Sequence, residues 1–307
     1  MAPLPPPACP TVAAIYAAYE ANQESGYRDH LGASLIGGPC ERAIWYTWRW
    51  QTRAKHAGRL LRLFQTGQLE EDRFVSDLRR IGVTVLDVDP ETGRQWTVRD
   101  DSGHFGGSKD GVAIGFPEAS KTWHVCEFKT HSAKSFKELK EKGVEQAKPQ
   151  HYAQMQVYMH LSEMDRAFYL AVNKDTDELY EERVKYDRAF AERLVAKAQR
   201  IIASPVPPSR ISNDPAWFQC RFCDHSPACH GDAMPERHCR SCLHSTPVEE
   251  GKWRCERHGW ALDLKAQRSG CALHLYIPAL VHGEQIDAGD DWVSYRTKDG
   301  GEWRDGK

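Results

Sequence analysis

The chain has 307 residues, of which 40% are hydrophobic and 27% are charged, and its formal net charge is −2. These values are ordinary for a soluble globular protein, and the length allows one large domain or two. No segment approaches the roughly 20 apolar residues of a membrane helix, and the start, MAPLPPPACP, lacks the basic and apolar regions of a signal peptide. We therefore expect a cytoplasmic protein that does not bind membranes.

Two local runs of basic residues stand out against this balanced charge. Residues 42–62 contain six Lys or Arg and no acid, and residues 121–148 contain seven lysines against four glutamates. Nucleic acids bind to local basic patches, so a net charge near zero does not exclude them as partners. An isolated run of charges is equally typical of a solvated face, and these runs gain weight only from the motifs beside them.

The first part of the chain predicts three helices, at 11–21, 40–50 and 58–80. The apolar residues of the third helix recur at intervals of three and four, which is typical of one buried helix face. This face contains Leu60, Phe64, Gly67, Glu71, Phe74 or Val75, and Leu78. Glu71 is thus a carboxylate on an apolar face, where it needs a partner or a metal to offset its desolvation.

The middle of the chain predicts strands and helices that indicate an α/β domain of about 200 residues, with a mixed central sheet flanked by helices. Strands are expected at 83–88, 96–98, 110–115, 122–130, 167–173 and 179–186, and helices at 133–146, 149–162 and 187–203. The Pro-rich run 204–210 is typical of a connector. We expect a first domain over 1–234, a cysteine-rich module over 235–280 and an acidic, hairpin-like tail over 281–307.

The sequence Glu127-Phe128-Lys129 lies on the clearest of these strands. Alternate side chains of a strand share one face, so Glu127 and Lys129 point the same way. Asp110 opens another strand after a Gly-rich turn. Together with Glu71, these residues supply three carboxylates and a lysine, which suit phosphodiester hydrolysis assisted by Mg²⁺ or Mn²⁺. The simpler alternative is an edge strand that carries a solvated ion pair.

A second pattern follows on the helix expected at 149–162. Gln150, Gln154 and Tyr158 are four residues apart, so they share one helix face. Amide and phenol groups can bind phosphate oxygens or bases without adding charge. The pattern alone is also typical of an ordinary polar helix face.

The ten cysteines are the strongest feature of the composition. In a reducing compartment, clustered cysteines indicate metal ligands rather than disulfides. Cys220, Cys223 and Cys229 form a C-x2-C-x5-C array. A four-thiolate site would need one further ligand from elsewhere in the chain, and Cys40 is the candidate.

The remaining cysteines predict a second site, which would bind zinc. Its four expected ligands are Cys239, Cys242, Cys255 and Cys271. His258 and His274 are alternates for the last two positions. In a rival arrangement, the two C-x2-C pairs combine into one zinc ribbon, which leaves Cys40 and Cys229 without a site. Cys126 is expected to be a small core residue.

Together, these motifs resemble the RecB-type branch of the PD-(D/E)xK nucleases, which includes the lambda-type phage exonucleases and the CRISPR-associated RecB-like nucleases. The resemblance covers roughly residues 58–190. G-Q-L-E-E at 67–71 is similar to the first-helix motif, D-G at 110–111 to the metal-binding aspartate, E-F-K at 127–129 to the E-x-K strand, and Q-M-Q-V-Y at 154–158 to the Q-x3-Y motif. Many members have a histidine near the first-helix glutamate, and this helix has none.

The resemblance implies a restriction-endonuclease-like core and a set of site residues. The residues implied for catalysis are Asp110, Glu127, Lys129, Glu71, Gln154 and Tyr158. The implied metal ligands are Glu71, Asp110, Glu127 and the backbone carbonyl of Phe128. Whether Glu70 or Glu71 is used is left open, although the apolar face favours Glu71.

The resemblance also implies a cofactor for the first set of cysteines. By analogy with the iron–sulfur RecB-like nucleases, one N-terminal and three C-terminal cysteines would hold a [4Fe–4S] cluster. These residues are Cys40, Cys220, Cys223 and Cys229. The cluster would join the two ends of the nuclease domain.

We therefore expect a metal-dependent DNA exonuclease that acts in phage recombination or in repair, on a duplex end or a single strand. A homo-oligomer or a recombination protein as its partner is left open. One alternative is a non-catalytic nucleic-acid-binding protein that metals stabilise. Another is an iron–sulfur protein in which oxidation of the cluster switches DNA binding.

Overall fold

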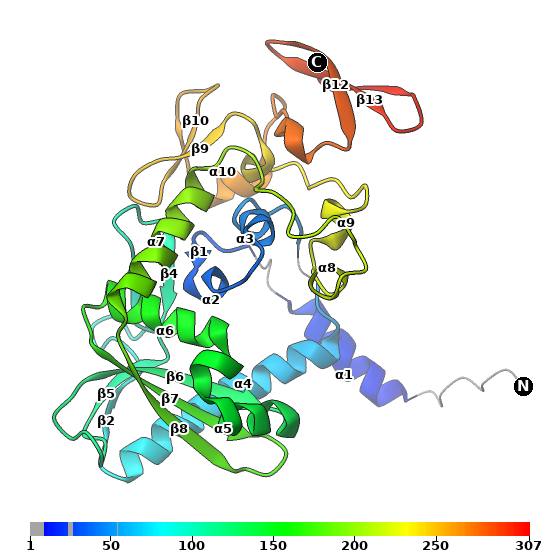
Figure 1. Ribbon diagram of the computed structural model, residues 1–307. Coiled ribbons are helices and arrows are strands. Elements are labelled where there is room, and N and C mark those ends of the chain that lie inside the picture. The colour runs from blue at the N-terminus through cyan, green and yellow to red at the C-terminus, as the bar shows by residue number, and fades with distance from the viewer. Residues whose placement is uncertain (1–8, 24–26, 54) are drawn as a thin grey trace, which may run out of the picture.

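The computed structural model describes residues 9–23, 27–53 and 55–307. Most of the segment MAPLPPPACP, which we interpreted as lacking a signal peptide, lies outside the described residues. The main sheet has five strands in the order β2-β5-β6-β7-β8 (Figure 1). They are Thr84–Leu86, Gly111–Ile114, His124–His131, Arg166–Asn173 and Leu179–Lys185. β6 and β7 pair in parallel, and the other neighbours pair antiparallel. The expected mixed sheet flanked by helices is confirmed.

The two faces of this sheet are covered by different helices. On one face, α4 (Gly58–Arg80) packs Phe74 against Phe128 of β6. The other face carries Val125 and is covered by α5 (Ala133–Ala147) and α6 (Pro149–Leu161), and α7 (Arg188–Ala203) packs against α6. Residues 125 and 128 thus belong to different cores, as the alternation along β6 predicts.

A second, three-stranded sheet lies against these helices and was only partly expected. Its order is β1-β4-β3, with strands Leu31–Gly32, Phe105–Ser108 and Thr97–Arg99. The helices before the main sheet are α1 (Pro10–Ala21), α2 (Ala33–Ile36) and α3 (Glu41–Trp48). Only the strand near 96–98 was predicted here, because β1 has two residues and β4 is rich in glycine.

The expectation of a continuous buried face on α4 is wrong for its first half. Phe64 is 47% exposed, whereas Phe74 and Leu78 are buried. α4 packs against α1, and Gly58 in its first turn lies against the backbone of Tyr16. Figure 1 shows α4 extending from α1 to the main sheet. Residue spacing identifies the apolar face but not how far the sheet reaches along it.

The C-terminal part of the chain follows the irregular segment 204–217. It begins with two short helices, α8 (Phe218–Arg221) and α9 (Ser226–Cys229). A three-stranded sheet follows, made of β9 (Ser245–Pro247), β10 (Trp253–Cys255) and β11 (Ala261–Leu262), and it is flanked by α10 (Leu264–Ser269) and the 3₁₀ turn Cys239–Ser241.

After the 3₁₀ turn Pro278–Leu280, the chain ends in an antiparallel sheet that projects from the rest (Figure 1). Its strands are β12 (Gly283–Gly289), β13 (Trp292–Thr297) and β14 (Glu302–Gly306). None of the helices in the described stretches is long and apolar enough to span a membrane.

A buried arginine joins the C-terminal part to the N-terminal helices. Arg240 has no exposed surface, and its guanidinium carbon lies 4.2–4.4 Å from the centres of three indole rings. These rings belong to Trp48, Trp50 and Trp253. The guanidinium donates hydrogen bonds to the carbonyls of Trp48 and Asp29 and to the side chain of Gln267. One side chain thus combines cation–π contacts with three hydrogen bonds.

The basic run at 42–62 does not form one surface. Arg49 is buried against the rings of Trp45 and Trp253 and donates to the carbonyl of Ser245. Arg42 donates to the carbonyl of Pro208. The exposed members are Arg53, Lys55, Arg59 and Arg62. The positive patch is therefore limited to the start of α4 and the segment before it.

Replacing Arg240 with alanine should destabilise the protein by about 3 kcal/mol or more, because the buried Trp48 carbonyl and Gln267 side chain lose their donor and a void opens between the rings. Denaturant unfolding followed by tryptophan fluorescence would measure the change. The matched control is Arg254→Ala on β10, whose side chain is 53% exposed, and it should change stability by less than about 0.5 kcal/mol. If the two variants lowered the free energy of unfolding equally, the aromatic contacts of Arg240 would contribute nothing to stability.

Candidate active site

Glu127 lies on β6 with no exposed surface. The ammonium of Lys129 is 2.5 Å from its Oε1, and Oε2 has no hydrogen-bond partner among the described residues. The two side chains are on the same face of the strand, as their spacing predicts. A buried carboxylate oxygen without a donor is rare and is typical of a site that takes an additional ligand.

Asp110 follows β4 and directly precedes β5, which pairs with β6. Its Oδ2 accepts a hydrogen bond of 2.8 Å from the amide of Phe128 and lies 3.6 Å from Nζ of Lys129. The same ammonium donates to the carbonyl of Phe128 at 2.8 Å. The expected ligand carbonyl is thus within reach of the acids, and in this structure it accepts from the lysine.

Glu71 approaches from α4 and is half-buried. Burial, together with the negative charge of Asp110, raises the pKa of Glu71 to about 7, although Lys129 opposes the shift. Glu70 instead lies 3.3 Å from the exposed Arg73. The structure therefore brings Glu71 to the other acids and places Glu70 in a separate ion pair.

The charges of the site favour an additional cation. Burial also raises the pKa of Glu127 to about 7, because the attraction of Lys129 does not fully offset desolvation and the repulsion of Asp110. Burial disfavours the ammonium of Lys129, but Glu127 and Asp110 outweigh this effect and raise its pKa. Three carboxylates thus share one permanent cation, and the two acids with raised pKa values hold protons that a metal would displace.

Tyr158 and Gln154 on α6 connect this site to the end of β4. The Tyr158 hydroxyl donates to the carbonyl of Ser108 at 2.7 Å and accepts from the Gln154 amide at 3.3 Å. A Cβ atom on Gly107 would lie 2.6 Å from that hydroxyl, so glycine is required for the contact. Tyr158 therefore fixes the backbone two residues before Asp110. Gln150, on the same helix, is exposed and does not join this network.

Two histidines that we did not single out in the sequence lie beside Lys129. His131 and His151 both contact the hydroxyl of the buried Tyr169, at 2.8 and 2.9 Å. Burial, reinforced by the nearby lysines, lowers the pKa of His131 to about 4 and that of His151 to about 3, so both are neutral near pH 7. The signals were present: His131 continues the 127–129 alternation, and His151 precedes Gln154 by one helical turn.

The family assignment follows from a comparison with known sequences. Residues 13–230 match the model of the PD-(D/E)XK nuclease superfamily. The chain belongs to this superfamily. Its fold and the arrangement of its acids and lysine agree with that membership, and its substrate is therefore a nucleic acid. No curated protein matches the chain as a relative.

Solved structures with a similar fold include two of an alkaline exonuclease (LHK-Exo) from Laribacter hongkongensis. The first is 17% identical and covers 62% of this chain and 91% of the exonuclease, with a TM-score of 0.42. The second, in complex with dAMP, is 15% identical, with the same coverage and a TM-score of 0.41. The structure of SSO0001 is 15% identical and covers 73% of this chain and 98% of SSO0001, with a TM-score of 0.41. These likenesses are too distant to assign an activity to the nuclease.

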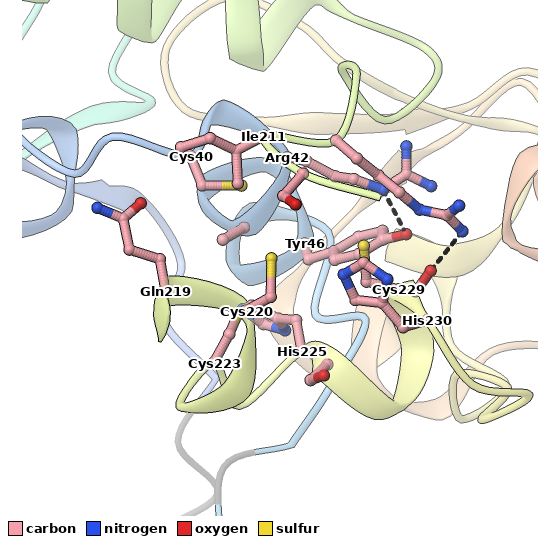
Figure 2. Close-up of a pocket in the computed structure, with 14 residues that line it drawn as sticks. Cys40, Arg42, Tyr46, Ile211, Gln219, Cys220, Cys223, His225, Cys229 and His230 are labelled. Atoms are coloured by element: carbon pink, nitrogen blue, oxygen red, sulfur yellow. Dashed lines mark hydrogen bonds between the residues drawn. The ribbon is translucent and has the colours of Figure 1, made fainter. Parts of the chain in front are cut away.

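The first set of cysteines of the nuclease lines one cavity, which Figure 2 shows. The four residues are Cys40, Cys220, Cys223 and Cys229. Cys40 precedes α3, Cys220 lies on α8, Cys223 follows α8, and Cys229 is the last residue of α9. The N-terminal and C-terminal ends of the family-matched region thus meet here. His225, which also lines the cavity, is 2.9 Å from the hydroxyl of Thr47 and is held by that contact.

The second set of cysteines lines a separate cavity around β10 and the 3₁₀ turn. They are Cys239, Cys242, Cys255 and Cys271. Nε2 of His258 is 3.8 Å from Sγ of Cys271, whereas His274 contacts the hydroxyl of Ser241. Eight of the cysteines thus line two separate cavities, four around each. Cys126 is fully buried in the sheet core, as expected.

The donor atoms decide which groups could bind at these three places. Among the described residues, no three cysteine, histidine or acidic side chains stand in the arrangement of a metal site. The ten cysteines, all in the described part of the chain, form no disulfide. Four thiols around one cavity fit a soft metal or a cluster, and the orphaned oxygen of Glu127 beside Asp110 fits a hard divalent cation.

Magnesium should bind the nuclease more tightly as pH rises, because the pKa values of Glu71 and Glu127 are both about 7 and ionisation frees their oxygens. If both protons are displaced, the apparent Kd should fall roughly a hundredfold from about pH 6 to about pH 8. Calorimetric titration in buffers of different ionisation heat would measure Kd and count the released protons.

The matched controls are Glu71→Gln and Glu70→Gln. The first should make the pH dependence of magnesium binding shallower, because one displaceable proton is lost. The second should leave it unchanged, because Glu70 pairs with Arg73. A pH-independent Kd in the unaltered protein would contradict this account of the site.

Proposed function

We propose that this nuclease is a metal-dependent DNA exonuclease that uses Mg²⁺ or Mn²⁺ and serves recombination or repair. The observation that carries the proposal is the buried Glu127, which lies beside Lys129 and Asp110 and has one oxygen without a partner. A buried acid of this kind is expected where a cation completes the site. The exonucleolytic form of the activity rests on the resemblance of the four motifs to the lambda-type exonucleases.

The residues divide the chemistry of phosphodiester hydrolysis among them. Glu71, Asp110 and Glu127 would hold the cation with the carbonyl of Phe128. A bound Mg²⁺ or Mn²⁺ supplies charge that polarises the phosphoryl oxygen and makes the attacking water more acidic. Lys129, held between two carboxylates, keeps its proton and can orient that water or stabilise the charge that develops on the phosphate.

Two further metals are part of the proposal. We infer that Cys40, Cys220, Cys223 and Cys229 hold a [4Fe–4S] cluster, and four thiols from distant parts of the chain around one cavity support this. The second cavity supports a tetrahedral zinc site in a zinc-ribbon-like module. Its ligands would be Cys239, Cys242, Cys255 and Cys271.

End-labelled linear DNA should be degraded in the presence of Mg²⁺ or Mn²⁺ and stay intact with EDTA, while circular DNA of the same sequence persists. Lys129→Ala should lower kcat by a factor of a hundred or more, because removal of one preorganised electrostatic group costs about that much. The matched control is Lys137→Ala on α5, whose side chain is 78% exposed and which should retain full activity.

Other results of this assay would redirect the proposal. Cleavage of circular DNA would indicate an endonuclease. Degradation of RNA but not DNA would change the substrate class. If the protein binds DNA and cuts none of these substrates, the non-catalytic binding protein becomes the better description of this chain.

Metal analysis of cysteine variants separates the two-site arrangement from the rival ribbon. Cys220→Ser should remove iron and its visible absorbance and leave zinc bound, whereas Cys239→Ser should remove zinc and leave iron. The control is Cys9→Ser, outside both cavities, which should retain both metals. Anaerobic preparations analysed by inductively coupled plasma mass spectrometry would give the contents. If both variants lost the same metal, the single ribbon would be correct.

A further inference from the structure

A pocket of about 370 Å³ adjoins the cysteine cavity and lies outside the set of acids. The two share Cys40, Ala43, Gln219, Cys223 and His225. The turn between α2 and α3, the first turn of α6 and the segment around α8 form the walls of the pocket. The turn packs closely against α6, since a Cβ atom added to Gly37 would lie only 3.0 Å from the Cα of Gln150. In Figure 2, Gln219 extends to the side of the cysteine cavity that is away from Cys229.

Apart from the two shared cysteines and His225, the lining of this pocket is apolar or uncharged. Leu35, Ala43 and Ile44 supply apolar surface, and Gln150 and Gln219 supply amides. None of the lining residues is Asp, Glu, Lys or Arg, so the pocket offers nothing to hold a phosphate by charge. An apolar slot with amide donors and acceptors suits a planar heterocycle that carries hydrogen-bonding edges.

Gln219 provides a second, independent observation. Its Oε1 is buried and has no hydrogen-bond partner among the described residues. Such an acceptor is expected to bind a donor from a ligand or water. Nearby on the same segment, the ring of Phe222 is 79% exposed and is available for a base to stack on.

The position of the pocket relates it to the catalytic residues through α6. Gln150 lines the pocket, Gln154 lies one turn later, and Tyr158 contacts Ser108 near Asp110. At 1.5 Å per residue, Gln150 and Tyr158 are about 12 Å apart along the helix. A DNA strand that advances about 3.4 Å per nucleotide would cover this distance with three or four nucleotides.

We propose that this pocket binds one unpaired nucleobase of the strand that is cut, three or four nucleotides from the scissile phosphate. The inference rests on the proposed DNA nuclease activity and adds a substrate preference to it. A base can enter the pocket only if its hydrogen-bonding edge is free, so the nuclease should favour ends that are single-stranded or frayed at this position.

Cleavage of single strands that carry one abasic nucleotide at successive positions tests the proposal. In the unaltered protein, one position should raise KM about tenfold with little change in kcat, because only binding of the base is lost. Ala43→Phe, which fills the pocket, should raise KM for the normal strand by a similar factor. Because Ala43 also lines the cysteine cavity, this variant must keep the iron content of the unaltered protein. The abasic nucleotide should then have no further effect in this variant, since the same contact cannot be lost twice.

A milder variant guards against misfolding of Ala43→Phe. Gln219→Leu keeps the volume of the side chain and removes the amide, and it should raise KM about threefold to tenfold. The matched control is Gln95→Ala, an exposed glutamine that lies outside the pocket and should behave like the unaltered protein.

The outcomes separate this inference from the proposed function. A scan in which no abasic position changes KM, while cleavage is normal, would overturn the pocket. Additive effects of Ala43→Phe and the abasic nucleotide would also overturn it. If no DNA is cut at all, the nuclease proposal fails. The pocket is then tested by measuring the affinity of the protein for strands that contain 2-aminopurine, in the presence of EDTA. An unchanged affinity of Ala43→Phe and Gln219→Leu in that assay would reject the pocket.

Discussion

Glu127 is a carboxylate with no exposed surface on the central strand of the main sheet. Burying a carboxylate costs free energy, and the surrounding groups offset this cost. Lys129 supplies the nearest opposite charge, while Asp110 is held close by the amide of Phe128. The low pKa values of His131 and His151 fit the same constraint. If either histidine carried a positive charge beside Lys129, it would neutralise the excess negative charge that attracts a metal ion.

The family-matched region is closed by contacts between segments that are far apart in the sequence. The cavity around Cys40 joins the start of α3 to α8 and α9, and Arg240 inserts between indole rings from α3, from the second residue after α3 and from β10. Lys197 on α7 adds hydrogen bonds to the carbonyls of Ile36 and Gly38. These contacts fix the α2–α3 turn independently of the main sheet, so the C-terminal part has a direct influence on where that turn lies.

Regular elements could be predicted from the sequence because their spacing reflects local burial: α5, α6, α7 and the strands of the main sheet lie within a few residues of their expected positions. The order of the motifs likewise identified Glu71, Asp110, Glu127 and Lys129, which the structure brings together. The aromatic contacts of Arg240 could not be predicted, because they depend on three tryptophans from distant segments. The exposed half of α4 was misjudged for the same reason: periodicity shows which face is apolar, and only the tertiary fold determines what covers it.

The helix α6 links these parts, because each of its successive turns contacts a different one. Its first turn lies against Gly37 and lines the neutral pocket through Gln150. Its later turns hold the backbone before Asp110 through Tyr158. The same helix therefore contacts both the α2–α3 turn and the backbone that leads into Asp110. A metal bound through Cys40, the last residue of this turn, would therefore constrain where the substrate strand lies relative to the acids without itself taking part in the chemistry.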